Sequence, residues 1–553
     1  MSEYPDVPES IFRTPMRVDQ SPRVRAPSHQ PRHARIIPRK PSFWPTIGWT
    51  ALGTLVPGVG LWRGGRRVAG PIVTGVFVVL VGALTTLWFG ARDDVIGFAT
   101  QSSNLLMVAI AVLTLGLAWV VVIGVSHFAL RAPHPTTGQR AAGAVVVGLL
   151  SLAVMAPAAL GADIAYTVAT AINGIFEEDP PGEPVGPDIP VVAVDPWENI
   201  PRINVMLLGG DHDKGRSESK GSRTDAVVVA SINTKTGATT LISIPRQTGH
   251  MPFPKDSKLN RYFPNGWYDG RSGTNPDYFL NAMHLLPRMV PAGTLGKYGY
   301  IEAVKLSVGE ALGLKIDYFA MLDMDGFKDF INAIGGITVN VNQRLPIGGV
   351  TGKRKPITRA NGWTLPAGWI EPGPNQHMSG YRALWYARGR FNLDDYNRQA
   401  RQRCAINAVV RKINPANILQ KYNAVAKAAN ESIMTDIPQK ALPAMLTLAE
   451  RVKGATMRSV GFVNGKDGFV SSNPNFALMR TQVKTALKDT DAANTPAATP
   501  SPGSTTPGSS TPGSSTPPKK GTQSVDTADA CAYRPIPAKD DPNQGIGISP
   551  PKR

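Results

Sequence analysis

Three long stretches without charged residues limit what this chain can fold into. They cover residues 68–91, 95–130 and 141–162, and each is bounded on both sides by a charged residue. A helix needs about 20 mostly apolar residues to cross the hydrocarbon core of a bilayer, and each stretch is at least that long. Buried helices of soluble proteins rarely stay apolar over such lengths. The sequence therefore predicts an α-helical transmembrane region over residues 45–168.

The distribution of basic residues predicts how these spans are oriented. Residues 1–44 contain 8 basic and 4 acidic residues, and we expect them to form a basic, disordered tail in the cytoplasm. The segment 42–62 has basic residues on both sides, which favours a re-entrant or interfacial hairpin that turns at Pro57–Gly58. Three spans would then place the large domain outside the cell membrane, whereas a fourth full span would place it in the cytoplasm.

Composition divides the remainder of the chain into three parts. Residues 169–199 are rich in proline and acidic residues and predict an extended linker, residues 200–489 have globular patterning, and residues 490–553 predict a disordered Pro/Ser/Thr-rich tail. The chain has two cysteines, Cys404 and Cys531, which excludes a CxxC metal site. In an oxidising compartment they could pair and attach the tail to the domain, or they could remain two free thiols.

The globular region carries nearly all of the net charge. Residues 201–490 contribute +18 of the total of +19. Such an excess is consistent with a solubilising surface, or with attraction to anionic lipid headgroups and phosphate-bearing substrates. Nucleic acid is not an expected partner, because the predicted compartment lacks it and no aromatic–basic binding motif is present.

Four charged residues are expected to meet at one edge of a sheet. Three apolar runs follow one another with the spacing of an antiparallel meander, so the end of the first, the start of the second and the end of the third share an edge. The residues at these positions are Asp211, Arg223, Asp225 and Arg246. Two carboxylates and two guanidinium groups suit a divalent cation that bridges phosphate oxygens.

A second set of polar residues lies on two predicted helices. The first helix is expected to begin at Ser379 and to end near Arg388 and Arg390. In the second, from Asp395, helical periodicity places Asp395, Arg398 and Gln402 on the same stripe as apolar residues that face the core. Charged residues are rarely buried unless they are paired or bind a ligand. The alternative is a structural ion pair between Asp395 and Arg398 on the helix surface.

Residues 204–480 resemble the LytR–CpsA–Psr proteins of Gram-positive and actinobacterial envelopes. The resemblance rests on eight blocks in the family's order, which are NVMLLGGD (204–211), SRTDAVVVASIN (222–233), LISIPRQT (241–248), SKLN (257–260), LGLKIDYFAMLDMDGF (312–327), AIGGITVNV (333–341), MSGYRALWYARGRF (378–391) and DYNRQARQ (395–402). One departure is Gln247, where an aspartate is usual in the family.

The resemblance implies a phosphotransferase that acts in cell wall assembly. Such a protein binds a polyprenyl-pyrophosphate-linked glycopolymer and moves the polymer onto peptidoglycan, with Mg²⁺ or Mn²⁺ assisting. Arabinogalactan and teichoic-acid-like polymers are the implied substrates, and pyrophosphatase activity is an implied side reaction. The alternatives are a polyprenyl-pyrophosphate phosphatase or a non-catalytic protein that binds the carrier lipid or polymer.

The resemblance also implies roles for individual residues. Asp211 and Asp225 match the metal ligands, Arg246, Arg388, Arg390 and Arg398 match the pyrophosphate-binding arginines, Asp395 matches a base or an orienting partner for an arginine, and Arg223 and Gln402 match substrate contacts.

The expected fold is α/β, a single LytR–CpsA–Psr-type domain with a central mixed sheet flanked by helices on both faces, preceded by the transmembrane helices. The prenyl chain should need an apolar groove beside the charged site. A helix within residues 300–335 is a candidate wall, with core packing as the alternative for its apolar residues, which are Leu306, Val308, Leu312 and Phe319.

Overall fold

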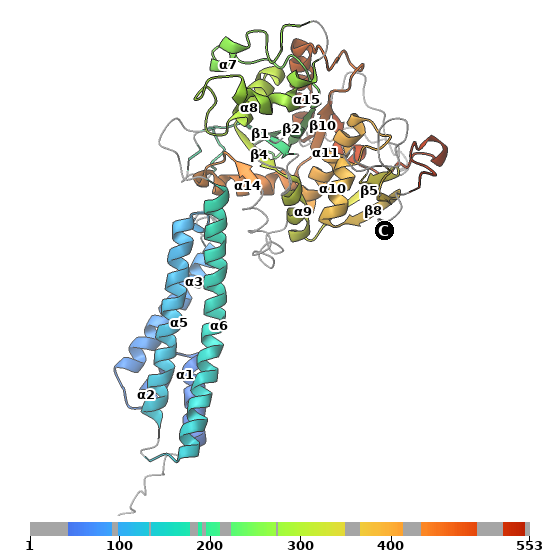
Figure 1. Cartoon of the computed structure of the whole chain (residues 1–553). Helices are drawn as coiled ribbons and strands as arrows, with labels where there is room; N and C mark the ends of the chain where they lie inside the picture. Colours follow the sequence, from blue (N-terminus) through green and yellow to red (C-terminus); the bar gives the residue numbers. More distant parts are fainter. Residues whose placement is uncertain are drawn as a thin grey trace, which may run out of the picture.

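A bundle of long helices joins an α/β domain in this protein (Figure 1). The computed structural model describes residues 43–90, 98–131, 134–176, 186–187, 189–190, 195–210, 223–271, 275–348, 365–412, 433–494 and 524–547.

Three helices are long and apolar enough to cross a membrane, as judged by length and composition. They are α3 (Ala69–Gly90), α5 (Ser102–Leu130) and α6 (Thr137–Ile175). Helices α5 and α6 pack closely against each other, with Gly116 of α5 facing Met155 and Ala158 of α6. Small residues allow such close approach between helices in lipid.

The segment before these spans forms a short helical hairpin. Helix α1 (Phe43–Leu55) has 13 residues, which corresponds to about 20 Å, so α1 alone is too short to span the hydrocarbon core. It is followed by α2 (Val59–Arg63) after a turn in which Gly58 has a φ of 100°. A side chain at Gly58 would also collide with the carbonyl O of Gly70, so the turn requires glycine. This matches the hairpin expected at Pro57–Gly58.

The core of the domain is a seven-stranded mixed sheet. Its strand order is β11-β10-β3-β2-β1-β4-β9. Parallel pairing occurs between β1 and β4 and between β3 and β10, and the other neighbours are antiparallel. The strands are β1 (Arg202–Gly210), β2 (Thr224–Asn233), β3 (Thr239–Ile244), β4 (Tyr318–Leu322), β9 (Ile433–Thr435), β10 (Met457–Gly461) and β11 (Val525–Asp526). The mixed sheet confirms the predicted fold class.

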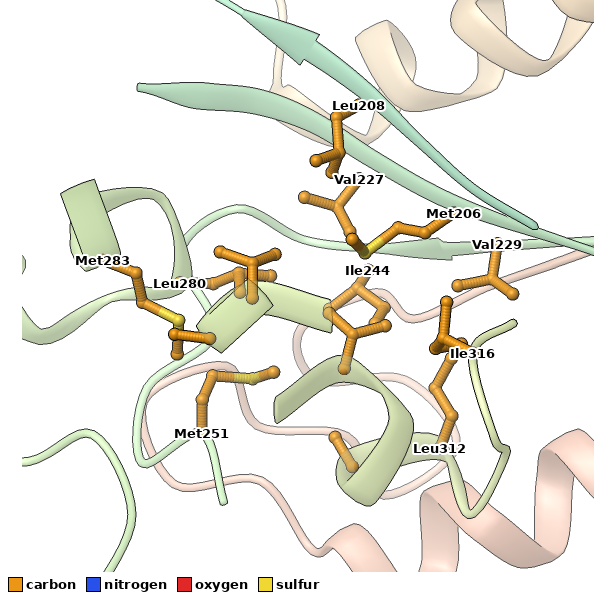
Figure 2. Close-up of a cluster of buried hydrophobic side chains, with 14 of the residues drawn as sticks. Met206, Leu208, Val227, Val229, Ile244, Met251, Leu280, Met283, Leu312 and Ile316 are labelled. Carbon is orange, nitrogen blue, oxygen red and sulfur yellow. The ribbon is translucent and has the colours of Figure 1, made fainter. Parts of the chain in front are cut away.

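Helices cover both faces of this sheet because its strands are apolar on both sides. One face packs on α8 (Tyr300–Leu312) and α15 (Phe476–Asn494). Figure 2 shows side chains of this cluster from the strands, including Met206, above Leu312 of α8. The other face packs on α11 (Asp395–Lys412) and α14 (Leu442–Gly454) through residues such as Val228 and Val410.

A smaller cluster lies beside the main sheet. It is formed by α9 (Met324–Ala333), α10 (Gly380–Arg388), α11 and two short hairpins. The hairpins pair β5 (Ile337–Val341) with β8 (Gly373–Met378) and β6 (Leu345–Ile347) with β7 (Gly368–Ile370). The remaining short helices are α7 (Lys258–Tyr262), η2 (Pro276–Tyr278), η3 (Leu280–Arg288), η4 (Gln439–Ala441), α16 (Thr527–Ala530) and η5 (Ala538–Asp540).

The prediction of a disordered tail over 490–553 is wrong for part of that range. Helix α15 continues to Asn494, and residues 524–547 are folded onto the domain. A disulfide joins Cys404 of α11 to Cys531, and β11 pairs with β10. Arg344 also donates hydrogen bonds to the carbonyl groups of Asn543 and Ile546. These specific contacts order a segment whose composition alone predicts disorder.

Candidate active site

The predicted meander brings charged residues to one edge of the sheet. Gly210 at the end of β1 pairs with Thr224 at the start of β2, and Val227 pairs with Ile244 at the end of β3. Asp225 is therefore close to Arg246, which lies two residues beyond β3. Their side chains form an ion pair in which Arg246 Nη1 is 2.5 Å from Asp225 Oδ1.

Residues in the first turn of α11 complete the charged cluster by contacting this edge of the sheet. Arg398 is almost fully buried, with 2% of its side chain exposed. Its Nη2 atom donates to the carbonyl O of Asp225 at 3.0 Å and to Asp395 Oδ2 at 3.1 Å. Arg398 and Asp395 therefore face inward, as predicted for this helix, and Arg398 connects the helix to the sheet.

Asp395 is the centre of the cluster. Its Oδ1 atom lies 3.0 Å from Arg398 Nη2, 3.3 Å from Arg390 Nη1 and 3.6 Å from Arg246 Nε. Its Oδ2 atom accepts a further hydrogen bond from Gln399. Both carboxylate oxygens are therefore engaged by side-chain donors that fix their position. Of the two roles considered for Asp395, these contacts favour the orienting partner for the arginines over the base.

Opposite charges in the cluster stabilise one another's ionised forms. Burial raises the pKa of Asp225, but the charges of Arg246 and Arg398 outweigh it and hold that pKa below its ordinary value. Burial lowers the pKa of Arg398 to about 10, while Asp395 acts in the opposite direction. Burial likewise lowers the pKa of Arg390. At neutral pH, Asp225 is an anion and Arg398 remains a cation.

Two guanidinium N–H groups in the cluster are buried and make no hydrogen bond within the described residues, although Arg246 Nε lies 3.6 Å from Asp395 Oδ1. They are the Nε–H groups of Arg246 and Arg398. An unsatisfied buried donor costs about 1–3 kcal/mol. Oriented donors of this kind suit an anion with several oxygens, such as a phosphate.

An apolar cavity of about 450 Å³ extends from this cluster. Its polar lining consists mainly of residues from the sheet edge and from α10 and α11, and these are Asp225, Arg388, Arg398 and Gln402. Its apolar lining includes Leu207, Phe327, Phe330, Ile406 and Val409. The cavity follows α11 from Arg398 to Val410, a rise of about 18 Å along the helix. It can hold a long apolar chain with its charged end at the arginines.

The cavity lies on the opposite face of the sheet from most of the residues considered for the prenyl groove. Helix α9, within the range 300–335, does form one wall. Val308, Leu312 and Phe319 instead belong to the core on the other face, where at most 1% of each is exposed. Leu306 is partly exposed and lines other, more polar cavities. For Val308, Leu312 and Phe319, core packing was the correct alternative.

Arg246 is oriented even though Gln247 stands where the family usually has an aspartate. The Gln247 side chain is exposed, and Arg246 is held by Asp225 and Asp395 instead.

Sequence patterns missed one further residue, Arg401, which is buried and donates to the carbonyl groups of Tyr386 and Gly389. Arg401 thereby fixes the end of α10 against α11. No motif indicated this role, because every residue has a backbone carbonyl group and the partner therefore cannot be recognised from residue type.

One predicted site residue, Arg223, is not brought into the cluster, and another, Asp211, is not described. Arg223 is exposed just before β2, where its charge acts on His284. Asp211 lies outside the described residues. Within the described ranges no group of three or more His, Cys, Asp or Glu side chains could hold a metal ion. Asp225 alone, whose Oδ1 atom is paired with Arg246, does not make a complete Mg²⁺ or Mn²⁺ site.

Comparison with protein families gives one match that covers more than half of the chain. The model of the LytR_cpsA_psr family matches residues 182–489.

Curated relatives match about half of this chain. The biofilm regulatory protein A of Streptococcus mutans is 26% identical over 45% of this chain, and the match spans about half, 54%, of that relative's length. A protein of Enterococcus faecalis named polyisoprenyl-teichoic acid–peptidoglycan teichoic acid transferase TagU is 24% identical over 53% of this chain and 78% of its own. Among solved structures, TagV of Bacillus subtilis is 21% identical with a TM-score of 0.34 and covers 52% of this chain and 97% of its own.

Proposed function

Because the chain belongs to the LytR–CpsA–Psr family, we propose that it transfers a polyprenyl-pyrophosphate-linked glycopolymer onto peptidoglycan in cell wall assembly. Several relatives, including the E. faecalis protein, are named for transfer of teichoic acid from a polyisoprenyl carrier to peptidoglycan. The polymer class proposed for this chain is arabinogalactan or a teichoic-acid-like polymer.

One observation supports this proposal above the others. The arginine cluster lies at one end of an apolar cavity, so a single site offers cations for a pyrophosphate and an apolar channel for a prenyl chain. A ligand with both features is the chemistry that such a site selects. The buried Nε donors of Arg246 and Arg398 would then find acceptors in the phosphate oxygens.

In the proposed reaction, a peptidoglycan hydroxyl attacks the phosphorus that carries the polymer. A bond forms between the hydroxyl oxygen and that phosphorus, the bond to the bridging oxygen breaks, and prenyl monophosphate leaves. The hydroxyl proton passes to the leaving phosphate or to solvent. Phosphoryl transfer depends mainly on positioning and on neutralisation of charge. Arg398 and Arg246 would bind the non-bridging oxygens, and Asp395 would keep both guanidinium groups in place.

We also propose that Mg²⁺ or Mn²⁺ assists, with Asp211 and Asp225 as ligands. The lowered pKa of Asp225 keeps this carboxylate anionic, as a metal ligand requires. A bound cation would neutralise phosphate charge. Titration of the full-length protein with Mn²⁺, followed by electron paramagnetic resonance, tests this directly. Equal binding by wild type and Asp225→Ala would contradict the assignment of this ligand.

The proposed location of the domain is extracytoplasmic, with the N-terminus in the cytoplasm. Three membrane-capable helices and a hairpin too short to be a fourth span give an odd number of crossings. Protease added to intact spheroplasts should therefore remove the domain and spare an N-terminal tag. Protection of the domain under those conditions would place it in the cytoplasm.

The transfer reaction itself can be separated from hydrolysis by its product. Full-length protein should convert a labelled lipid-linked polymer and peptidoglycan fragments into a polymer–peptidoglycan phosphodiester. If the polymer is released only as a phosphate monoester, the protein is a phosphatase. If the lipid is bound and no product of either kind forms, the protein is a carrier-binding module.

A further inference from the structure

The end of helix α6 is hydrogen-bonded to the α/β domain. Gln439 Nε2 in η4 donates to Asn173 Oδ1 and to the carbonyl O of Phe176, both at 3.0 Å. Asn173 lies in the last turn of α6, and Phe176 follows its final residue. Helix α6 also packs against β9, the outermost strand of the sheet. In Figure 1 the end of α6 lies beside α14, which follows η4 directly.

The segment that makes this contact is fixed firmly to the interior of the domain. Thr435 Oγ1 donates to the carbonyl O of Phe319 at 2.6 Å, and the N–H of Phe319 donates to Asp436 Oδ1 at 2.6 Å. Lys305 Nζ donates to Asp436 Oδ2 at 2.7 Å, and only 3% of the Asp436 side chain is exposed. This segment is therefore a rigid support and not a loose tether.

The same short segment forms part of the apolar cavity. Ile433, at the start of β9, lines the cavity, and Gln439 holds α6 six residues later. Two pinned residues, Thr435 and Asp436, lie between them. The position of the cavity is therefore coupled to the position of the membrane helix through Ile433–Gln439.

The height of this contact above the bilayer suits a lipid substrate. Asp163 is the first charged residue of α6 after the apolar stretch, and we place the edge of the hydrocarbon core there. Asn173 is ten residues further along the helix, or about 15 Å. The headgroup layer is roughly 5–8 Å thick on each side of the bilayer. The contact thus holds the domain about 7–10 Å above the headgroup layer, close to the level at which the pyrophosphate of a membrane-held carrier would lie.

We propose that the segment Ile433–Gln439 is a positioning clasp that sets the apolar cavity against the bilayer surface, so that a prenyl chain enters the cavity while its carrier remains in the membrane. This proposal rests on the proposed function, because it assumes that the cavity takes a prenyl pyrophosphate. Gln439 and Asn173 act through the placement of the domain and contact no reacting atom.

The test uses the full-length protein in vesicles of phosphatidylcholine and phosphatidylglycerol. A double variant, Asn173→Lys with Gln439→Lys, places two like charges at the contact and should separate the helix from the domain. A matched control, Thr170→Lys with Thr447→Lys, adds the same charges at exposed positions on α6 and α14. The substrates are a long-chain photoreactive prenyl pyrophosphate in the vesicles and water-soluble farnesyl pyrophosphate.

The double variant should lose roughly tenfold or more in labelling and turnover of the membrane-held substrate, because it loses the effective concentration that the clasp supplies. Turnover of farnesyl pyrophosphate should match that of wild type and of the control. Equal loss on both substrates, or no loss on either, would overturn the clasp. Labelling without turnover in wild type would show that the pyrophosphatase side reaction is absent, and labelling alone would then judge the clasp. No labelling of wild type would overturn both proposals.

Discussion

Asp395 is surrounded by Arg246, Arg390 and Arg398, and its contribution should be to hold them in place. Asp395→Asn should lower kcat/KM for a prenyl pyrophosphate by about 10–100-fold, as for other orienting partners, with a raised KM. A role as proton acceptor would instead lower kcat and leave KM unchanged. Steady-state kinetics distinguish these outcomes, and Asp394→Asn on the neighbouring exposed residue is the control.

Ionised Asp225 should stabilise the folded protein, and this stabilisation should be lost in acid. Its pKa in the folded protein lies below the unfolded value of about 3.9, so the stabilisation is present above that value and is lost as the pH falls through the folded pKa. Asp317 and Asp436 have pKa values raised by burial and therefore act in the opposite direction.

The contribution of Asp225 is isolated by comparison with Asp225→Asn in chemical denaturation between pH 6 and about pH 3, around the ordinary aspartate pKa. The difference in unfolding free energy between wild type and variant should shrink as the pH falls. A difference that stays constant with pH would show that the ion pair with Arg246 does not stabilise the fold.

The positions of these residues could be predicted because each depends on local periodicity. Strand order in a meander places Asp225 near Arg246, and helical spacing turns Arg398 inward. Their partners could not be predicted. The choice of Asp395 as a common centre depends on how α11 packs over the sheet. Arg223 is exposed and its charge acts on His284, although it is adjacent in sequence to β2.

Helix α11 lines the cavity, so enlarging one of its side chains should block the prenyl chain selectively. Ile406→Trp is expected to fill part of the 450 Å³ cavity and to weaken binding of long prenyl pyrophosphates far more than binding of inorganic pyrophosphate. Ala449→Trp, on the exposed side of α14, controls for the added aromatic surface. Equal weakening of both ligands, measured by competition binding, would mean that the chain binds elsewhere.

The disulfide between Cys404 and Cys531 should stabilise the same helix. It closes a loop with a sequence separation of 127 residues. Cys404→Ser with Cys531→Ser should lower the free energy of unfolding by about 2–5 kcal/mol, the usual range for removal of a native disulfide. Denaturant titration of the double variant and of reduced wild type should agree. Unchanged stability in both would show that the noncovalent contacts of residues 524–547 are sufficient.

Elements with their own periodic signal could be predicted, and those defined by distant partners could not. The helix from Asp395 and the three strands of the meander follow from apolar spacing alone. Strand β11 has two residues and owes its place to pairing with β10. The sequence also did not predict which face of the sheet carries the cavity. The residues of β1 are apolar on both faces, so its pattern does not distinguish them.

The whole molecule combines a membrane bundle, an apolar cavity and an arginine cluster in one chain. The bundle could be predicted from three uncharged stretches, but the contact between Gln439 and Asn173 could not, since it joins residues 266 positions apart through side chains of ordinary type. The proposed activity requires all three parts, because the carrier has to be reached in the bilayer, held by its chain and bound by its pyrophosphate.

The most direct test is release of prenyl monophosphate from a long-chain prenyl pyrophosphate by the full-length protein in vesicles, with Mg²⁺ present. Wild type should turn over, and Arg398→Ala should lose about 10²–10³-fold in kcat, as expected for loss of one oriented donor to the transition state. Arg411→Ala, an exposed position on the same helix, should behave as wild type. Turnover that is the same in wild type and Arg398→Ala would show that the arginine cluster is not the active site.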